Sequence, residues 1–190
     1  MPLRTLGALA LATTLGLSAC SGDDPEPTFA PSPSASATSA VASPSAPSDG
    51  EPTRPALARQ FSATGADALV TYFWQLADYA QATGDVRPLK KVSAAECAPC
   101  TSGRKAISAV YDDGGQIEGG ETTVNILETK RVRLREGPAF QVLARVKNQA
   151  QRIDLPGDSK DGEFPSSTIR ATFVVINENG VPIISYWNAQ

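Results

Sequence analysis

Apolar side chains first recur at the spacing of a helix within residues 61–84. They fall at intervals of three and four residues, so they share one face of a single long helix. Thr64 is the expected N-cap, because its hydroxyl can accept a backbone N–H, and Gly84 is the expected C-cap. The apolar face consists of Leu69, Tyr72, Phe73, Leu76 and Ala80.

Two shorter helical segments follow this helix. Residues 85–92 predict one or two turns. Ser93 and Glu96 have the spacing of a capping box, and Pro99 suits the first turn of a helix. The pattern therefore predicts a second substantial helix, which the glycines at 114–115 end.

From residue 121 the hydrophobic period changes to two, which is typical of strands with one buried face. Asn179-Gly180 is a strong signal for a two-residue hairpin turn, whereas residues 116–120 and 155–166 are expected to be loops. Helices followed by strands joined by tight turns predict an α+β domain, with the helices packed on a curved four-stranded antiparallel sheet. The predicted strands are residues 121–135, 140–147, 168–176 and 181–187.

The apolar run near the N-terminus indicates a signal peptide over residues 1–19. Its core, Leu6 to Leu17, is too short to span a bilayer. The run ends in Leu17-Ser18-Ala19-Cys20, the form of a lipobox, so we expect Cys20 to carry lipid. The alternative is a secretory signal whose cleavage leaves Cys20 free. Lipidation would anchor the protein on the extracytoplasmic side of the cell membrane, which makes the membrane its first partner.

Residues 20–58 are rich in Pro, Ser and Ala. Such a segment cannot bury enough apolar surface to offset the entropy lost on ordering it. We therefore expect a disordered tether that follows the lipidated cysteine. The folded domain is expected over residues 59–190.

Composition narrows the possible functions. The chain has 17 basic and 20 acidic residues, a net charge of -3, which argues against a nucleic-acid partner. It has no histidine, which removes Ser-His-Asp and Cys-His catalysis and every His-ligated metal site. We expect no metal and no cofactor, and we assign no catalytic residue.

Cys97-Ala98-Pro99-Cys100 is the sharpest chemical motif in the chain. A zinc site needs four ligands and this motif supplies two, while a c-type haem needs a histidine at the position of Thr101. A thioredoxin-like redox pair would also lie at a helix N-terminus, but such pairs follow a buried strand, which residues 90–96 do not form. In an exported protein we expect a structural disulfide between Cys97 and Cys100.

Four features together resemble an uncharacterised actinobacterial lipoprotein family, the domain of unknown function 6318. They are the lipobox, the Pro/Ser/Ala-rich tether, Thr83-Gly84-Asp85 at the end of the long helix, and the paired cysteines. The order of the elements is similar to that of the NTF2-like superfamily, which implies a cone. The family has no assigned activity, so the resemblance implies location and fold but no catalytic residues. Enzymes of that superfamily usually place Asp, His and Tyr in the cone. The lack of histidine weakens the possibility that this domain is such an enzyme.

Tyr72, Trp74 and Trp187 are the large side chains that we expect at the open end of the cone, between the first helix and the concave face of the sheet. Aromatic residues at this spacing can equally form core. We interpret the domain as a non-catalytic module that binds a small apolar ligand or an envelope protein. The alternatives are a thiol–disulfide oxidoreductase acting through Cys97 and Cys100, and a purely structural protein of the cell envelope.

Overall fold

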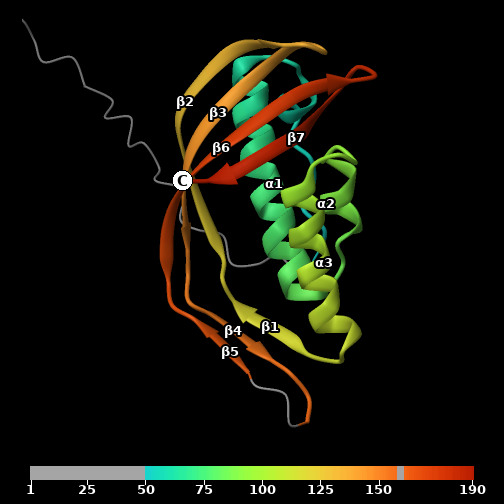
Figure 1. The fold of residues 1–190 in the computed structure, drawn as a ribbon, viewed down its shortest axis with the longest axis vertical. Helices are drawn as coiled ribbons and strands as arrows, with labels where there is room; N and C mark the ends of the chain where they lie inside the picture. Colours follow the sequence, from blue (N-terminus) through green and yellow to red (C-terminus); the bar gives the residue numbers. More distant parts are fainter. Residues whose placement is uncertain (1–49, 158–160) are drawn as a thin grey trace, which may run out of the picture. The chain divides into compact units, whose positions relative to one another are not determined.

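Four long antiparallel strands form the main sheet, and the helices pack on its concave face (Figure 1). The order of the strands is β2-β3-β6-β7. This arrangement confirms the predicted α+β class and the NTF2-like cone with its curved four-stranded sheet. The strands are β2 (Thr122–Leu134), β3 (Gly137–Asn148), β6 (Ser167–Glu178) and β7 (Val181–Ala189).

The computed structural model describes residues 50–157 and 161–190. These residues belong to one compact unit, Ala42–Gln190, and their hydrophobic core draws only on residues from Ala58 to Trp187. The unit therefore carries a core of its own. The predicted signal peptide, Cys20 and most of the predicted tether lie outside the described residues. In the described part of the chain, no helix has the length and hydropathy needed to cross a membrane.

A second, smaller sheet extends the cone beyond a bend. The order of its strands is β1-β4-β5. This order matches β2-β3-β6 in the main sheet, because β1 precedes β2 in the sequence, β4 follows β3, and β5 precedes β6. The predicted loops at 116–120 and 155–166 are therefore wrong in part, since they contain β1 and β5, and β4 has no counterpart among the predicted strands. The short strands are β1 (Gln116–Gly119), β4 (Gln151–Asp154) and β5 (Gly162–Phe164).

The bend between β1 and β2 depends on two adjacent glycines. Gly119 and Gly120 have φ values of 70° and 84°, in the left-handed region that glycine adopts readily. A Cβ atom on Gly119 would lie 2.4 Å from the carbonyl oxygen of Ala150, so the neighbouring backbone also requires glycine. The turn therefore lets the chain pass from the second sheet into the main sheet.

The long predicted helix is α1 (Ala63–Thr83), and its predicted apolar face is buried. Gly84 ends α1 as predicted, with φ 76° and an N–H that donates to the carbonyl of Ala80 at 2.8 Å. The predicted N-cap is wrong. Ser62 caps the helix instead, because its Oγ accepts the N–H of Gly65 at 3.1 Å, and Thr64 lies inside the first turn.

The remaining helices are short or half-exposed. The predicted capping box at residues 93–96 is wrong, because Cys97 caps α3 and its Sγ accepts the N–H of Cys100 at 3.3 Å. Ser93 instead forms an isolated bridge with Ile184 of β7, which fixes the segment before α3 against the sheet. These helices are η1 (Leu57–Arg59), α2 (Arg87–Lys91) and α3 (Ala98–Asp112).

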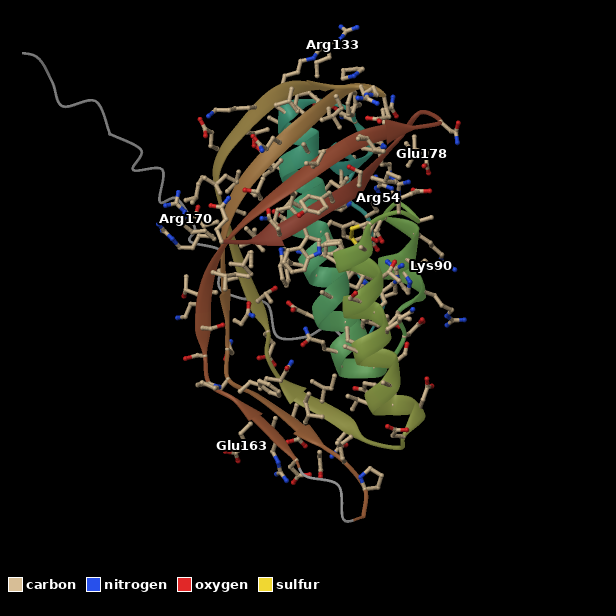
Figure 2. The ribbon with its side chains drawn as sticks, viewed as in Figure 1. Arg54, Lys90, Arg133, Glu163, Arg170 and Glu178 are labelled. Carbon is tan, nitrogen blue, oxygen red and sulfur yellow. A yellow bond between two sulfur atoms is a disulfide. The ribbon has the colours of Figure 1, made fainter. Side chains whose placement is uncertain are left out.

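Part of the predicted tether packs against the domain. Arg54 donates through Nη2 to the carbonyl of Pro182 at 2.6 Å and to that of Ala58 at 2.8 Å (Figure 2). The hydroxyl of Tyr72 donates to the carbonyl of Pro52 at 3.0 Å, and Ala58 is fully buried. The folded domain therefore includes residues that the sequence assigned to the tether.

Aromatic rings fill the cone between α1 and the main sheet. The rings of Phe61 and Phe140 lie 5.0 Å apart, and those of Phe73 and Phe173 lie 6.2 Å apart, both in edge-to-face contact. Phe173 is fully buried. These rings belong to the hydrophobic core or pack against it.

Candidate functional site

An apolar cleft of about 290 Å³ lies between α1, α3 and the second sheet. Its volume is close to the lower end of the range of small-molecule sites, roughly 300–1,000 Å³. Trp74 and Ala77 contribute from α1, Ala106 and Ile107 from α3, and Ile153 from β4. The cleft is thus bounded by α3 and by strands that the sequence did not reveal, and not by the concave face of the main sheet alone.

Two of the three predicted ligand-binding residues line this cleft. The rings of Trp74 and Trp187 lie 5.7 Å apart in edge-to-face contact, and Trp187 also stacks on Phe173 at 5.8 Å. Tyr72 is not among the described residues that line the cleft. Its ring is buried on another side of α1, and burial raises the pKa of its hydroxyl. The structure therefore brings together the two tryptophans but not the tyrosine.

The paired cysteines form part of the same wall. The Sγ atoms of Cys97 and Cys100 are bonded at 1.97 Å, with their Cα atoms 5.3 Å apart (Figure 2). Cys100 and its neighbour Pro99 line the cleft at the N-terminus of α3. Cys97 is fully buried and Cys100 is 2% exposed. Because exchange requires access to a sulfur atom, this burial favours a structural disulfide over a redox pair.

A second hollow of about 420 Å³ adjoins the apolar cleft and is more polar. Trp74, Gln81 and Gln151 line both spaces. The side-chain amide of Gln151 donates to the side-chain oxygen of Gln81, and this hydrogen bond links β4 to α1 between the two spaces. Thr122 and Asn148 add polar groups to the second hollow only. We refer to this second hollow as the polar annex of the apolar cleft.

Asp78 of α1 is the most perturbed acid near the site. Its Oδ2 accepts from the backbone N–H of Thr122 at 3.1 Å and from the Thr122 hydroxyl at 3.0 Å. Burial, with a smaller contribution from the negative charge of Glu121, raises the pKa of Asp78 to about 6, although the bonds from Thr122 act in the opposite direction. Asp78 was not among the site residues predicted from the sequence.

A signal for Asp78 exists in the sequence. Asp67 and Asp78 are eleven residues apart, three helical turns, so they lie on the same side of α1. In the structure each binds a threonine of β2, since the hydroxyl of Thr129 donates to Asp67 as that of Thr122 does to Asp78. Asp67 and Asp78 are the only charged residues of α1, so their place on one side of the helix indicates polar partners on a neighbouring element.

A third hollow, of about 550 Å³, lies on the surface of the second sheet and suits a ligand less well. Charged side chains border it, among them Glu118, Arg152 and Glu163, and Glu163 points away from the helices (Figure 2). Arg152 is already paired with Asp161 at 3.0 Å. Within residues 50–157 and 161–190, no group of three His, Cys, Asp or Glu residues is placed to hold a metal ion.

The fold and cleft define an NTF2-like α+β domain with an apolar cleft between its helices and its bent sheet. The chain belongs to a family of unknown function, DUF6318, whose sequence profile matches residues 38–180. No curated protein matches the chain.

Solved structures of similar fold are distant in sequence. The intermembrane space region of the chloroplast protein ARC6 has a TM-score of 0.50 and 12% identity, and the match covers 68% of this chain and 97% of that one. An uncharacterised protein with a cystatin-like fold from Caulobacter vibrioides has a TM-score of 0.39 and 11% identity, over 66% and 85% of the two chains. Aln2 from a Streptomyces species has a TM-score of 0.37 and 11% identity, over 69% and 93%. At such identities the likeness concerns fold alone.

Proposed function

We propose that the protein is a lipid-anchored, extracytoplasmic binding protein that holds a small apolar ligand in the cleft between α1 and α3. The cleft is the observation that carries this proposal, because it combines an apolar lining with a few polar groups at one end. The lipobox at Cys20 and the tether after it support the anchored location. The domain stands off the membrane in this proposal and presents the cleft to the envelope.

Binding rather than conversion suits the residues at the cleft. The chain has no histidine, and the described residues that line the cleft include no acid or base. The burial of Cys97 and Cys100 argues against the oxidoreductase alternative. Docking of a partner protein on the sheet becomes the preferred function if the cleft binds no small molecule.

The test is a binding screen on the compact unit, residues 42–190. The panel contains isoprenoid alcohols, fatty acyl amides, phospholipids and cell-wall peptides. The chain has only two tryptophans, Trp74 and Trp187, and both line the cleft, so intrinsic fluorescence reports on this site. A ligand at a hundred times its dissociation constant stabilises the folded protein by about 2.7 kcal/mol, which raises the melting temperature measurably.

A matched pair of variants locates the binding. Ala106 and Ala109 are both exposed alanines of α3, but only Ala106 is among the described residues that line the cleft. Ala106→Glu places a carboxylate at the cleft and should abolish both the fluorescence change and the melting shift. Ala109→Glu adds the same charge to the same helix and should preserve both. Equal effects of the two variants, or a panel without a single binder, would exclude the cleft as the site.

A further inference from the structure

Unpaired polar atoms gather around the two connected spaces. Among the described residues, five buried side-chain nitrogen or oxygen atoms have no hydrogen-bond partner in the protein. One is Nε of Arg54, near the start of the domain. The other four are Nε1 of Trp74, Oδ1 of Asp78, Oδ1 of Asn148 and Nε1 of Trp187. Buried polar groups are nearly always paired, so four exceptions in one region call for a common explanation.

The four groups belong to one neighbourhood. Trp74 and Asp78 are one turn apart on the same side of α1. Asp78 is bonded to Thr122, and Thr122 lies opposite Asn148 in the pairing of β2 with β3. Trp74 and Asn148 both line the polar annex, and the ring of Trp187 is 5.7 Å from that of Trp74. Three of the unpaired groups therefore belong to residues that line the cleft or the annex, and the fourth, Asp78, is bonded to Thr122, which lines the annex.

Their chemistry is complementary. An indole N–H can only donate, so Trp74 and Trp187 supply two donors without acceptors. The free oxygens of Asp78 and Asn148 supply two acceptors without donors. A single head group that both accepts and donates could satisfy both kinds, and a primary amide offers two lone pairs and two N–H groups.

We propose that the ligand carries an uncharged head group that both donates and accepts hydrogen bonds, a primary amide or a hydroxyl, on an apolar body that fills the cleft. This inference rests on the proposed function and names its ligand class. Trp74 is 9% exposed, so its N–H is withdrawn from solvent and must find its acceptor within the site.

The charges at the site disfavour an anionic head group. The described residues that line the cleft and the annex include no lysine or arginine to balance a carboxylate or phosphate. Asp78 lies beside the annex through its bonds to Thr122, and Glu121 directly precedes Thr122 in the chain. An anion placed there would meet like charge and leave the free oxygens of Asp78 and Asn148 unpaired.

The test compares four probes on residues 42–190 at pH 7.5, with tryptophan fluorescence and calorimetry as readouts. Octanamide, heptyl methyl ketone and octanoate share one heptyl chain and have head groups of nearly equal shape. The amide donates and accepts, the ketone only accepts, and octanoate only accepts and is charged. Octylammonium, the fourth probe, only donates. We expect octanamide to bind at least about tenfold more tightly than each of the others, because each of those leaves buried groups unpaired.

The outcomes separate this inference from the proposed function. Binding of the probes with less than a tenfold preference for octanamide overturns the head-group inference and leaves the cleft as a binding site. Tightest binding of octylammonium shows a cation site and also overturns it. The absence of binding by any of the four probes overturns the inference and the proposed function together.

A pair of variants tests the part played by Asp78. Asp78→Asn removes the charge and adds donors, so the preference for octanamide over octanoate should fall about tenfold. Asp67→Asn is the control, because Asp67 lies on the same helix and also binds a threonine of β2, three turns from the site. An unchanged preference in Asp78→Asn, or an equal fall in both variants, would remove Asp78 from the site. If Asp78→Asn does not fold, the ranking of probes on the wild-type domain still decides the inference.

Discussion

Protonation of Asp78 should make the domain more stable in mild acid than at neutral pH. Burial raises the pKa of its carboxyl from the ordinary 3.8 to about 6 in the folded state. The folded protein therefore binds this proton more tightly than the unfolded chain does between pH 3.8 and 6. Its contribution to the free energy of unfolding falls as the pH rises through this window and stays low above it.

The size of the effect follows from the pKa difference. Two pKa units correspond to about 3 kcal/mol, and solvent at the partly exposed side chain reduces this to about 1–3 kcal/mol. Asp78→Asn keeps an oxygen for the Thr122 N–H and carries no charge. We expect the variant to be more stable than the wild type at pH 7.5 by about 1–3 kcal/mol, and the two proteins to converge near pH 4.

The assay is urea unfolding of residues 42–190 at intervals from pH 4 to pH 7.5, compared between wild type and Asp78→Asn. Asp85→Asn is the control with the opposite sign. Hydrogen bonds from exposed Arg87 lower the pKa of Asp85 to about 2. The contribution of the Asp85 carboxylate to the free energy of unfolding is therefore complete above pH 3.8 and is lost only in stronger acid. This control should run parallel to the wild type from pH 5 to pH 7.5. Parallel curves for Asp78→Asn as well would refute the reasoning about its burial.

Three further predictions concern backbone, disulfide and anchor. Gly84→Ala should lower the free energy of unfolding by about 2 kcal/mol or more, because φ is 76° and the new Cβ would lie 2.7 Å from the ring of Tyr111. Gly103→Ala, on exposed α3, should instead raise the free energy of unfolding by about 0.5–1 kcal/mol. Urea unfolding measures both changes. Cys97→Ala should lower it by about 2 kcal/mol, the entropy of a very short disulfide loop, and leave the domain folded by circular dichroism. Cys20→Ser should move the protein out of the membrane fraction of cells, and unchanged fractionation with the leader removed would contradict the lipid anchor.

The sequence predicted the elements whose patterns are long. The apolar face of α1 repeats over several turns, and the four strands of the main sheet each alternate over many residues, so periodicity alone locates them. The hairpin at Asn179-Gly180 forms as predicted, with φ values of 51° and 84°. Three- and four-residue strands such as β1, β4 and β5 carry too few positions for an alternating pattern, and the glycines at 119–120 conceal the continuity of β1 with β2.

The site was less predictable because it depends on which elements come together. Trp74 and Trp187 were expected to line a pocket or to form core. The structure places both at the cleft, with Trp74 in the core and Trp187 packed against it. Tyr72 shares a helix face with core residues, yet its hydroxyl is bonded to Pro52, a contact that no local pattern reveals. The spacing of Asp67 and Asp78 hints at polar partners, but the partner of Asp78 is identified only when β2 is placed beside α1, because Thr122 belongs to that strand.

Among the helices that line the cleft, α3 contributes the fewest buried residues to the protein core. Cys100 is its one fully buried residue, and every residue of this helix is described. Polar and covalent links hold it instead: the disulfide at its start, the bond from Arg104 to the hydroxyl of Ser93 at 2.8 Å, and the bond from the Tyr111 hydroxyl to the carbonyl of Gln81. Elements with little apolar burial open at low free energy. A ligand in the cleft would supply α3 with the apolar contact that the protein core gives it only at Cys100, so binding and the ordering of this helix should stabilise each other.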